Sequence, residues 1–204
     1  MKSALSLLAV LILIPAALLA AEPHKAPAAL IAALAQPPLV PAAGPKDADV
    51  TIVEFFDYNC PFCKKTAPEL RKLLHVDPKV RILYKEWPIF GDVSEYAARS
   101  ALAANWQGKF LSAHDALIET AHDLDENSQV DAVLKSAGVD LTQLARDRTT
   151  HATEITAILA RNAQEATALG FHGTPGIVIG RQLLTRSLTV KELEQLTRNA
   201  RSSP

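Results

Sequence analysis

The chain has few cysteines: among its 204 residues there are two, Cys60 and Cys63. Because only two residues separate them, a bond between them would close almost no loop and would add little of the stability that a structural disulfide provides. Two thiols also fall short of the four ligands of a structural zinc site. A structural disulfide or zinc site therefore explains the pair poorly, and a chemical role of the two thiols is favoured.

The chain also lacks an excess of positive charge, and methionine is scarce. The 21 Lys and Arg residues against 22 Asp and Glu give a formal net charge of −1, which offers no basic surface for nucleic acid. Met1 is the only methionine, and the six histidines show no tight metal-ligand spacing. We therefore predict no nucleic-acid partner, no metal site and no cofactor.

The first 21 residues have the layout of a secretory signal peptide. Met1-Lys2 gives a short positive start, Leu5 to Ile14 is almost wholly apolar, and small residues follow as far as Ala21. An uncleaved membrane anchor is the alternative, although the apolar run is shorter than the ~20 residues that a span needs. Residues 1–21 thus predict export to the periplasm, where disulfides persist, and removing them leaves a chain of 183 residues.

Residues 22–46 are expected to form a linker or tether. Six of the thirteen prolines lie there, which excludes a long helix or a central strand. Ala28 to Ala35 has room for two helical turns, but so short a helix is marginal alone. It is either mobile or docked on something, for example a second subunit.

A strand-to-helix junction is predicted around the two cysteines, in a domain spanning residues 47–200. Val50 to Phe56 is β-branched and aromatic, which is typical of a buried strand. Pro61 then suits the first turn of a helix. A second strand is expected from Val80 to Tyr84 or Glu86.

Helices follow, and strands return near the end. Residues 92–169 carry a succession of amphipathic patterns without internal repeats, which predicts an all-helical block. Two short apolar runs flank Gly180-Arg181-Gln182 and indicate a hairpin. A capping box formed by Thr189 and Glu192 should open the last helix. The predicted order is β-α-β, helical block, β-β-α, an α/β fold.

Two segments resemble the DsbA-like family of bacterial periplasmic oxidoreductases. The first is Glu54-Phe-Phe-Asp-Tyr-Asn-Cys-Pro-Phe-Cys-Lys64, and the second, about 110 residues later, is Gly173-Thr-Pro-Gly176. Within that family, the lead-in to the cysteines and the Thr-Pro loop are most similar to the ScsC-like branch. The resemblance covers roughly residues 46–200 and implies a thioredoxin-like fold, with the helical block inserted between its two halves.

The chemistry expected of the pair is thiol–disulfide exchange. A helix N-terminus stabilises a thiolate, so Cys60 should be the attacking nucleophile and Cys63, one turn further in, the resolving thiol. The resemblance implies that Thr174-Pro175 is a cis-proline loop beside Cys60 and pairs with an extended substrate strand.

Three more residues are expected to tune the pair. Glu54 lies in an apolar strand, where a carboxyl group is costly unless it is paired or moves a proton. The resemblance implies that Glu54 carries the proton of Cys63 and influences the redox poise. Lys85 of the neighbouring strand is a candidate partner for its carboxyl group, and the alternative is a salt bridge at the sheet edge without redox effect. Pro61 and Phe62 separate the cysteines. Strong oxidants of this family have histidine at the position of Phe62, so we expect a milder oxidant or an isomerase.

A loop histidine, His172, lies near Pro175 and is expected to be exposed rather than part of the site. The substrates implied are exported proteins, and a membrane redox partner would recycle the pair. A monomer recycled by an oxidase would form disulfides, whereas an oligomer kept reduced would isomerise or reduce them, and both directions stay open. The alternative from another class is copper tolerance, because a Cys-x-x-Cys pair suits Cu(I).

Overall fold

The computed structural model describes residues 28–34 and 40–202, and the predicted signal peptide lies outside them. The described residues form a mixed sheet with the strand order β1-β3-β2-β4-β5. Its strands are β1 (Ala42–Ala43), β2 (Val50–Phe56), β3 (Val80–Glu86), β4 (Gly176–Ile179) and β5 (Gln182–Leu184). The sequence did not predict β1, because two residues are too short to show a strand pattern.

The strand that leads to the cysteines, β2, lies in the middle of the sheet. It pairs in parallel with β3 and antiparallel with β4, so both of its edges are hydrogen-bonded. Glu54 is opposite Tyr84 on β3 and Ile177 on β4. The alternative interpretation of Glu54, a salt bridge at the sheet edge, is therefore wrong.

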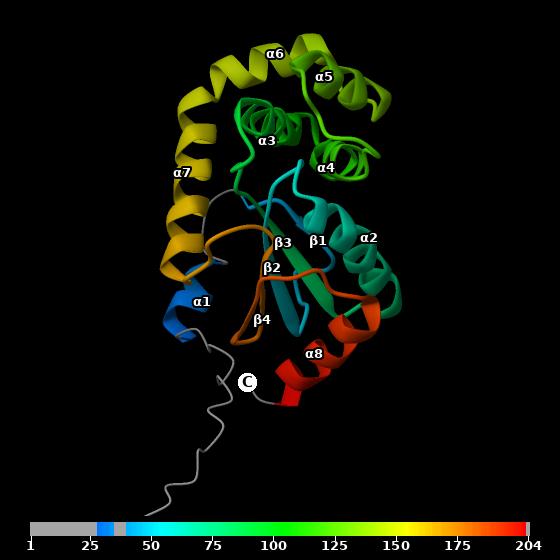
Figure 1. Cartoon of the computed structure of the whole chain (residues 1–204), viewed down its shortest axis with the longest axis vertical. Helices are drawn as coiled ribbons and strands as arrows, with labels where there is room; N and C mark the ends of the chain where they lie inside the picture. The colour runs from blue at the N-terminus through cyan, green and yellow to red at the C-terminus, as the bar shows by residue number, and fades with distance from the viewer. Residues whose placement is uncertain (1–27, 35–39, 203–204) are drawn as a thin grey trace, which may run out of the picture.

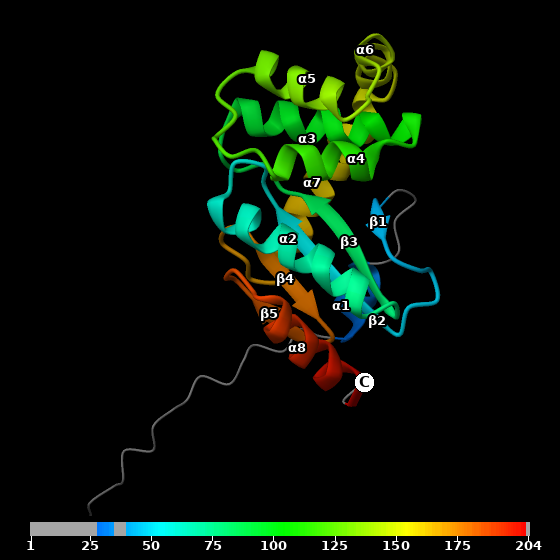
Figure 2. The same ribbon diagram turned by 90° about the vertical axis from the view of Figure 1, so that its right-hand side faces the viewer.

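Helices cover both faces of the sheet and one of its ends (Figures 1 and 2). α2 and α8 lie on one face, α1 and α7 lie on the other, and α3 to α6 form a cap above the cysteine end of β2. The helices are α1 (Ala28–Leu34), α2 (Pro61–Val76), α3 (Asp92–Ala104), α4 (Phe110–Ile118), α5 (Asn127–Ser136), α6 (Leu141–Thr150), α7 (Ala152–Ala168) and α8 (Val190–Ser202). This is the predicted thioredoxin-like fold with a helical insertion.

The short N-terminal helix α1 is docked on its own chain. Leu34 is fully buried and belongs to a cluster with Val53 and Phe55 of β2 and Ala166 of α7. A second, larger cluster fills the other face, between the sheet, α2, α8 and the cap. Of the two expectations for this segment, the structure shows docking, and the surface that receives it is the back of the sheet.

Lys85 does not pair with Glu54, and that expectation is wrong. Successive side chains of a strand point to opposite faces, and Lys85 of β3 is level with Phe55, not with Glu54. Its ammonium group instead lies 2.6 Å from Glu165 of α7 on the back of the sheet. Lys85 is fully buried, so this ion pair joins α7 to β3 and has no contact with the cysteine face.

The last helix begins as predicted. Glu192 accepts hydrogen bonds from the backbone N–H and the hydroxyl group of Thr189, at 2.9 and 2.8 Å. At its other end, Arg201 binds Asp49 before β2 and Asp77 after α2. Among the described residues, no helix is long and apolar enough to cross a membrane.

Candidate active site

Cys60 lies between the end of β2 and the start of α2, where it is the N-cap residue. Its N–H group donates to the carbonyl oxygen of Asp57 at 3.1 Å, and its sulfur accepts from the N–H of Cys63 at 3.3 Å. On its other side the thiol lies 3.2 Å from the carbonyl oxygen of Thr174, and the Thr174–Pro175 bond is cis. Two segments 114 residues apart thus meet at one sulfur.

The surroundings of Cys60 favour its thiolate. They lower the pKa of its thiol from 9.0 to about 6, first through a hydrogen bond from the Cys63 side chain, and further through Thr174 and the N–H groups of Cys63 and Phe62. Burial acts in the opposite direction, but it does not outweigh the hydrogen bonds. With this pKa, most Cys60 side chains are ionised at pH 7.

The surroundings of Cys63 favour its protonated thiol. It is fully buried in the first turn of α2, and burial raises the pKa of its thiol far above the ordinary value. The thiol of Cys60 and the negative charge of Glu54 raise it further. Cys63 therefore stays protonated until a base takes its proton. Both cysteines are free thiols in this structure.

Glu54 is a buried carboxyl group with no salt-bridge partner in the part of the chain that the structure describes. It is 1 % exposed, and its Oε2 atom has no hydrogen-bond partner among the described residues. Burial raises its pKa to about 8, and the charge of Cys60 contributes. Because the charge of Glu54 acts on the Cys63 thiol, a group able to hold a proton lies within electrostatic reach of the inner thiol.

Asp57 is a site residue that sequence reasoning missed. Its buried carboxylate accepts hydrogen bonds from four donors: the N–H groups of Asn59, Ile89 and Phe90, and the hydroxyl group of Ser94. These contacts fasten the lead-in to Cys60 onto the start of α3. The sequence signal was present, since an Asp directly after a buried strand is a common turn residue, but it did not indicate four partners.

Two neighbours of the cysteines, also missed from the sequence, bind the helical cap. The side-chain amide of Asn59 both donates to and accepts from the backbone of Leu124, at 2.9 Å each way. The ammonium group of Lys64 donates to the carbonyl oxygens of Thr120 and His122. The residues on either side of the Cys-Pro-Phe-Cys run are thereby held by the loop between α4 and α5.

The surface around the pair is partly apolar. Pro61 is the first residue of α2 and is exposed, and the side chain of Phe62 is 53 % exposed. Ile89 and Phe90, which Asp57 holds, are also exposed. His172 is exposed and has no hydrogen bond to the site, as expected.

The described residues contain no group of three or more His, Cys, Asp or Glu side chains arranged to hold a metal ion. The thiols of Cys60 and Cys63 are the soft metal ligands at this site.

Comparison with known proteins identifies the domain. Residues 51–198 match the family model of the DSBA-like thioredoxin domain. A thioredoxin-like oxidoreductase from Silicibacter pomeroyi DSS-3 is 39 % identical, with a TM-score of 0.77 over 82 % of this chain and 95 % of that one. The catalytic domain of Proteus mirabilis ScsC is 28 % identical, with a TM-score of 0.76 over 86 % and 97 %.

Further relatives differ in how much of their length this chain covers. A periplasmic thioredoxin-like protein from Salmonella enterica serovar Typhimurium is 28 % identical, with a TM-score of 0.73 over 88 % of this chain and 99 % of that one. A curated relative, a Na(+)/H(+) antiporter NhaA 3 of Salinispora tropica, is 39 % identical over 101 residues, which are 48 % of this chain and 15 % of the antiporter.

The chain thus spans a small part of the curated relatives that it matches, whereas it spans nearly all of the solved structures. The family model covers most of the described residues. The chain therefore belongs to the DSBA-like thioredoxin domain family, with ScsC among its relatives, and its matched domain is a protein-disulfide oxidoreductase.

Proposed function

We propose that the protein exchanges disulfides with exported proteins, with Cys60 as the attacking thiolate and Cys63 as the resolving thiol. The observation that carries this proposal is that the two thiols differ in protonation: Cys60 is largely a thiolate and Cys63 is a thiol. Cys60 has a pKa of about 6 and lies at a helix N-terminus beside Thr174, while Cys63 is buried and protonated. Attack needs a thiolate that is also a good leaving group. Resolution needs a second thiol that stays protonated until the mixed disulfide has formed.

The exchange runs in two steps in the direction that reduces a substrate. The Cys60 thiolate attacks one sulfur of the substrate disulfide; a mixed disulfide forms and the other substrate sulfur leaves as a thiolate. Cys63 then loses its proton to Glu54 and attacks Cys60, which releases the second substrate thiolate. Two electrons pass to the substrate, and Cys60 and Cys63 become a disulfide. The reverse sequence forms a disulfide in the substrate.

The substrate is a polypeptide in an extended form. The backbone beside Cys60 belongs to Thr174, directly before Pro175 and β4, and a strand can add to such a backbone by hydrogen bonding. The exposed side chains of Phe62, Ile89 and Phe90 suit apolar side chains of that strand. These features support protein substrates over small disulfides.

Export and recycling complete the proposal. The predicted signal peptide and the periplasmic relative from Salmonella support a periplasmic location, where a membrane redox partner would reset the pair. Phe62 adds no positive charge beside Cys60, in contrast to a histidine, so we expect an intermediate reduction potential that allows exchange in both directions.

The test is to equilibrate the purified mature protein in glutathione buffers and measure its reduction potential, its mass in solution, and its activity on insulin and on scrambled disulfides. The control is Cys60→Ser. We expect a potential within the range of the glutathione couple and activity that Cys60→Ser abolishes. A Cys60–Cys63 pair whose redox state does not change across the glutathione buffers would refute the proposed enzymatic activity. Tight copper binding without exchange activity would instead support the metal-binding alternative, and the mass would separate a monomer from an oligomer.

A further inference from the structure

The position of Glu54 raises the question of how its proton reaches solvent. This question rests on the proposed role of Glu54 as the acceptor of the Cys63 proton. A carboxyl group with a pKa of about 8 is mostly protonated at pH 7, so it must release its own proton before it can accept another. Because Glu54 is 1 % exposed in the middle of the sheet, it has no contact with bulk water, and the proton needs a route.

Tyr84 is the polar side chain next to Glu54 on that face. The two residues are directly paired across β2 and β3, and neighbouring strands lie only about 4.8 Å apart. Tyr84 is 6 % exposed. A phenol hydroxyl both donates and accepts, so it is able to pass a proton between two neighbours.

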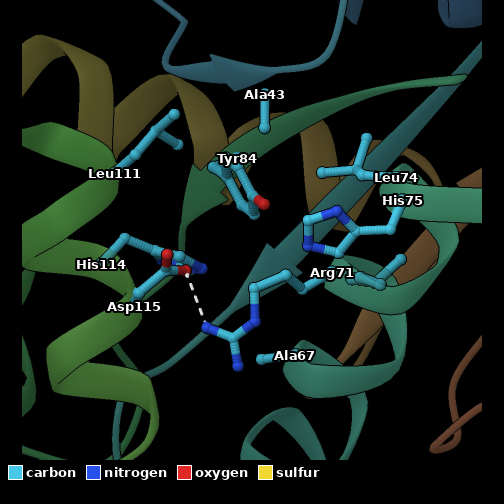
Figure 3. Close-up of a pocket in the computed structure, with 10 residues that line it drawn as sticks. Ala43, Ala67, Arg71, Leu74, His75, Tyr84, Leu111, His114 and Asp115 are labelled. Carbon is cyan, nitrogen blue, oxygen red and sulfur yellow. Dashed lines mark ion pairs between the residues drawn. The ribbon is translucent and has the colours of Figure 1, made fainter. Parts of the chain in front are cut away.

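The side chain of Tyr84 lines a cavity (Figure 3). It has a volume of about 220 Å³ and lies between α2 and α4, with Tyr84, His114 and Leu70 on its buried floor. Its rim includes exposed side chains, those of Leu111 and His75, so it reaches the surface. A cavity of this size with several polar groups in its wall has room for a chain of water molecules.

Charged groups surround the Tyr84 hydroxyl from both sides. Burial raises the pKa of Tyr84, the charges of Glu54 and Asp115 add to this, and the charge of Arg71 opposes it. The hydroxyl is therefore within electrostatic reach of the buried acid and of the ion pair in the cavity wall, Arg71 with Asp115 at 3.7 Å. Burial lowers the pKa of His114 to about 3, so its ring is neutral and adds no charge to the cavity wall at pH 7. The titratable groups around Tyr84 are Glu54 of β2, Tyr58 after β2, His114 and Asp115 of α4, and Arg71 and His75 of α2.

We propose that the cavity between α2 and α4 is the route by which Glu54 exchanges its proton with solvent, and that Tyr84 relays the proton between the carboxyl group and the cavity. In the reducing direction, Glu54 first releases a proton through Tyr84 to the cavity. Its carboxylate then takes the proton of Cys63 as the Cys63 sulfur bonds to Cys60 and the substrate thiolate leaves. Glu54 is then protonated again, as it was at the start, so one proton leaves through the cavity for each Cys63 that is oxidised.

The test isolates the second step with 5,5′-dithiobis(2-nitrobenzoate) as the disulfide. The first thionitrobenzoate is released when Cys60 is attacked, and the second when Cys63 resolves the mixed disulfide. We expect Tyr84→Phe to leave the first release unchanged and to slow the second by about tenfold, less than the roughly 100-fold or more of direct general acid–base catalysis because Tyr84 only relays the proton. Ala67→Leu, which fills the cavity, should slow it in the same way. Imidazole, a small proton carrier, should restore the rate of Tyr84→Phe.

Two controls separate a proton route from a structural effect. Ala132→Leu adds the same side chain to a hollow on α5, remote from the cysteines, and should resolve at the wild-type rate. A route changes rates but not equilibria, so the reduction potential of Tyr84→Phe should equal that of the wild type, whereas Glu54→Gln should slow resolution and also shift the potential.

The proposal is wrong if Tyr84→Phe and Ala67→Leu both resolve as fast as the wild type. It is also wrong if their slower rates come with an altered potential and no rescue by imidazole. Absence of the second release from the wild-type protein would instead refute the proposed function itself.

Discussion

Cys60 and Cys63 lie one helical turn apart, yet their thiols have opposite proton affinities. The N-cap position gives the Cys60 sulfur the N–H of Cys63, while the first turn of α2 buries Cys63 within electrostatic reach of the Glu54 carboxyl group. The difference arises from position alone, because the two side chains are chemically identical. A helix that starts at a cysteine therefore makes the first cysteine of a short motif an attacking thiolate and leaves the second as a protonated, resolving thiol.

Replacing Thr174 by valine tests the contribution of the loop to this difference. After the Cys63 side chain, Thr174 is the next group that lowers the pKa of Cys60. The Cys60 thiol contacts the backbone carbonyl oxygen of Thr174, and the Thr174 hydroxyl group, which has no hydrogen-bond partner among the described residues, is the donor that the thiolate would use. Thr174→Val should raise the Cys60 pKa by about one pH unit, followed through thiolate absorbance against pH. Its unfolding free energy should change little, since no second partner loses a bond. An unchanged thiolate titration would contradict the assignment.

Replacing Phe62 by histidine tests the departure from the strong oxidants of the family. Phe62 is largely exposed, so the helix should tolerate the change. A protonated imidazole near the helix N-terminus would stabilise the Cys60 thiolate, and a more stable reduced form is a stronger oxidant. We expect the reduction potential to rise by about 30 mV for each tenfold gain in the equilibrium constant. Phe62→Leu, which adds no charge, is the control and should keep the wild-type potential.

At the scale of elements, the cysteine loop is fixed to the helical cap as well as to the sheet. Asp57 binds the start of α3, Asn59 and Lys64 bind the loop before α5, and Thr174 reaches Cys60 from the start of β4. The cap is therefore part of the active site, because it limits how the loop before Cys60 can move.

Asp57→Ala is the sharpest test of that coupling. It would leave the N–H groups of Ile89 and Phe90 without their acceptor in a part-buried place, where each lost partner is costly. We expect the free energy of unfolding to fall by about 3 kcal/mol, measured by urea denaturation, with slower release of the first thionitrobenzoate because Cys60 is less firmly placed. Asp125→Ala, at an exposed side chain on the same cap, should cost less than about 0.5 kcal/mol. Equal losses from the two variants would contradict the role of Asp57.

The order of elements could be predicted from the sequence because local patterns encode it. β2, α2, the helical block, the hairpin and the Thr189 cap each carry a period or a turn signal within a few residues. Contacts between distant segments carry no such signal. Lys85 shows this: strand alternation places it on the face opposite Glu54, and its partner Glu165 is 80 residues away. The four donors to Asp57 and the cavity beside Tyr84 also depend on tertiary packing, which periodicity does not report.

For the whole molecule, the depressed pKa of Cys60 ties stability to redox state. A group whose pKa falls from 9.0 unfolded to about 6 folded stabilises the folded reduced protein fully above pH 9, and this contribution is lost as the pH falls through 6. The oxidised protein has no such thiolate. The raised pKa values of Glu54 and Glu86, about 8 each, act in the opposite sense, but they are present in both redox forms and largely cancel in the difference.

We therefore expect the reduced form to gain stability over the oxidised form as the pH rises. At 1.4 kcal/mol for each pH unit of pKa difference that is expressed, the gain between pH 5 and pH 7 should be about 1 to 2 kcal/mol. Urea denaturation of both forms across this range measures it, and reduced Cys60→Ser provides the baseline because it lacks the thiolate. A difference between the two forms that is independent of pH would mean that Cys60 is not a stabilised thiolate. It would also remove the thermodynamic reason for the pair to accept electrons, since a folded protein prefers to be reduced only where folding stabilises the thiolate.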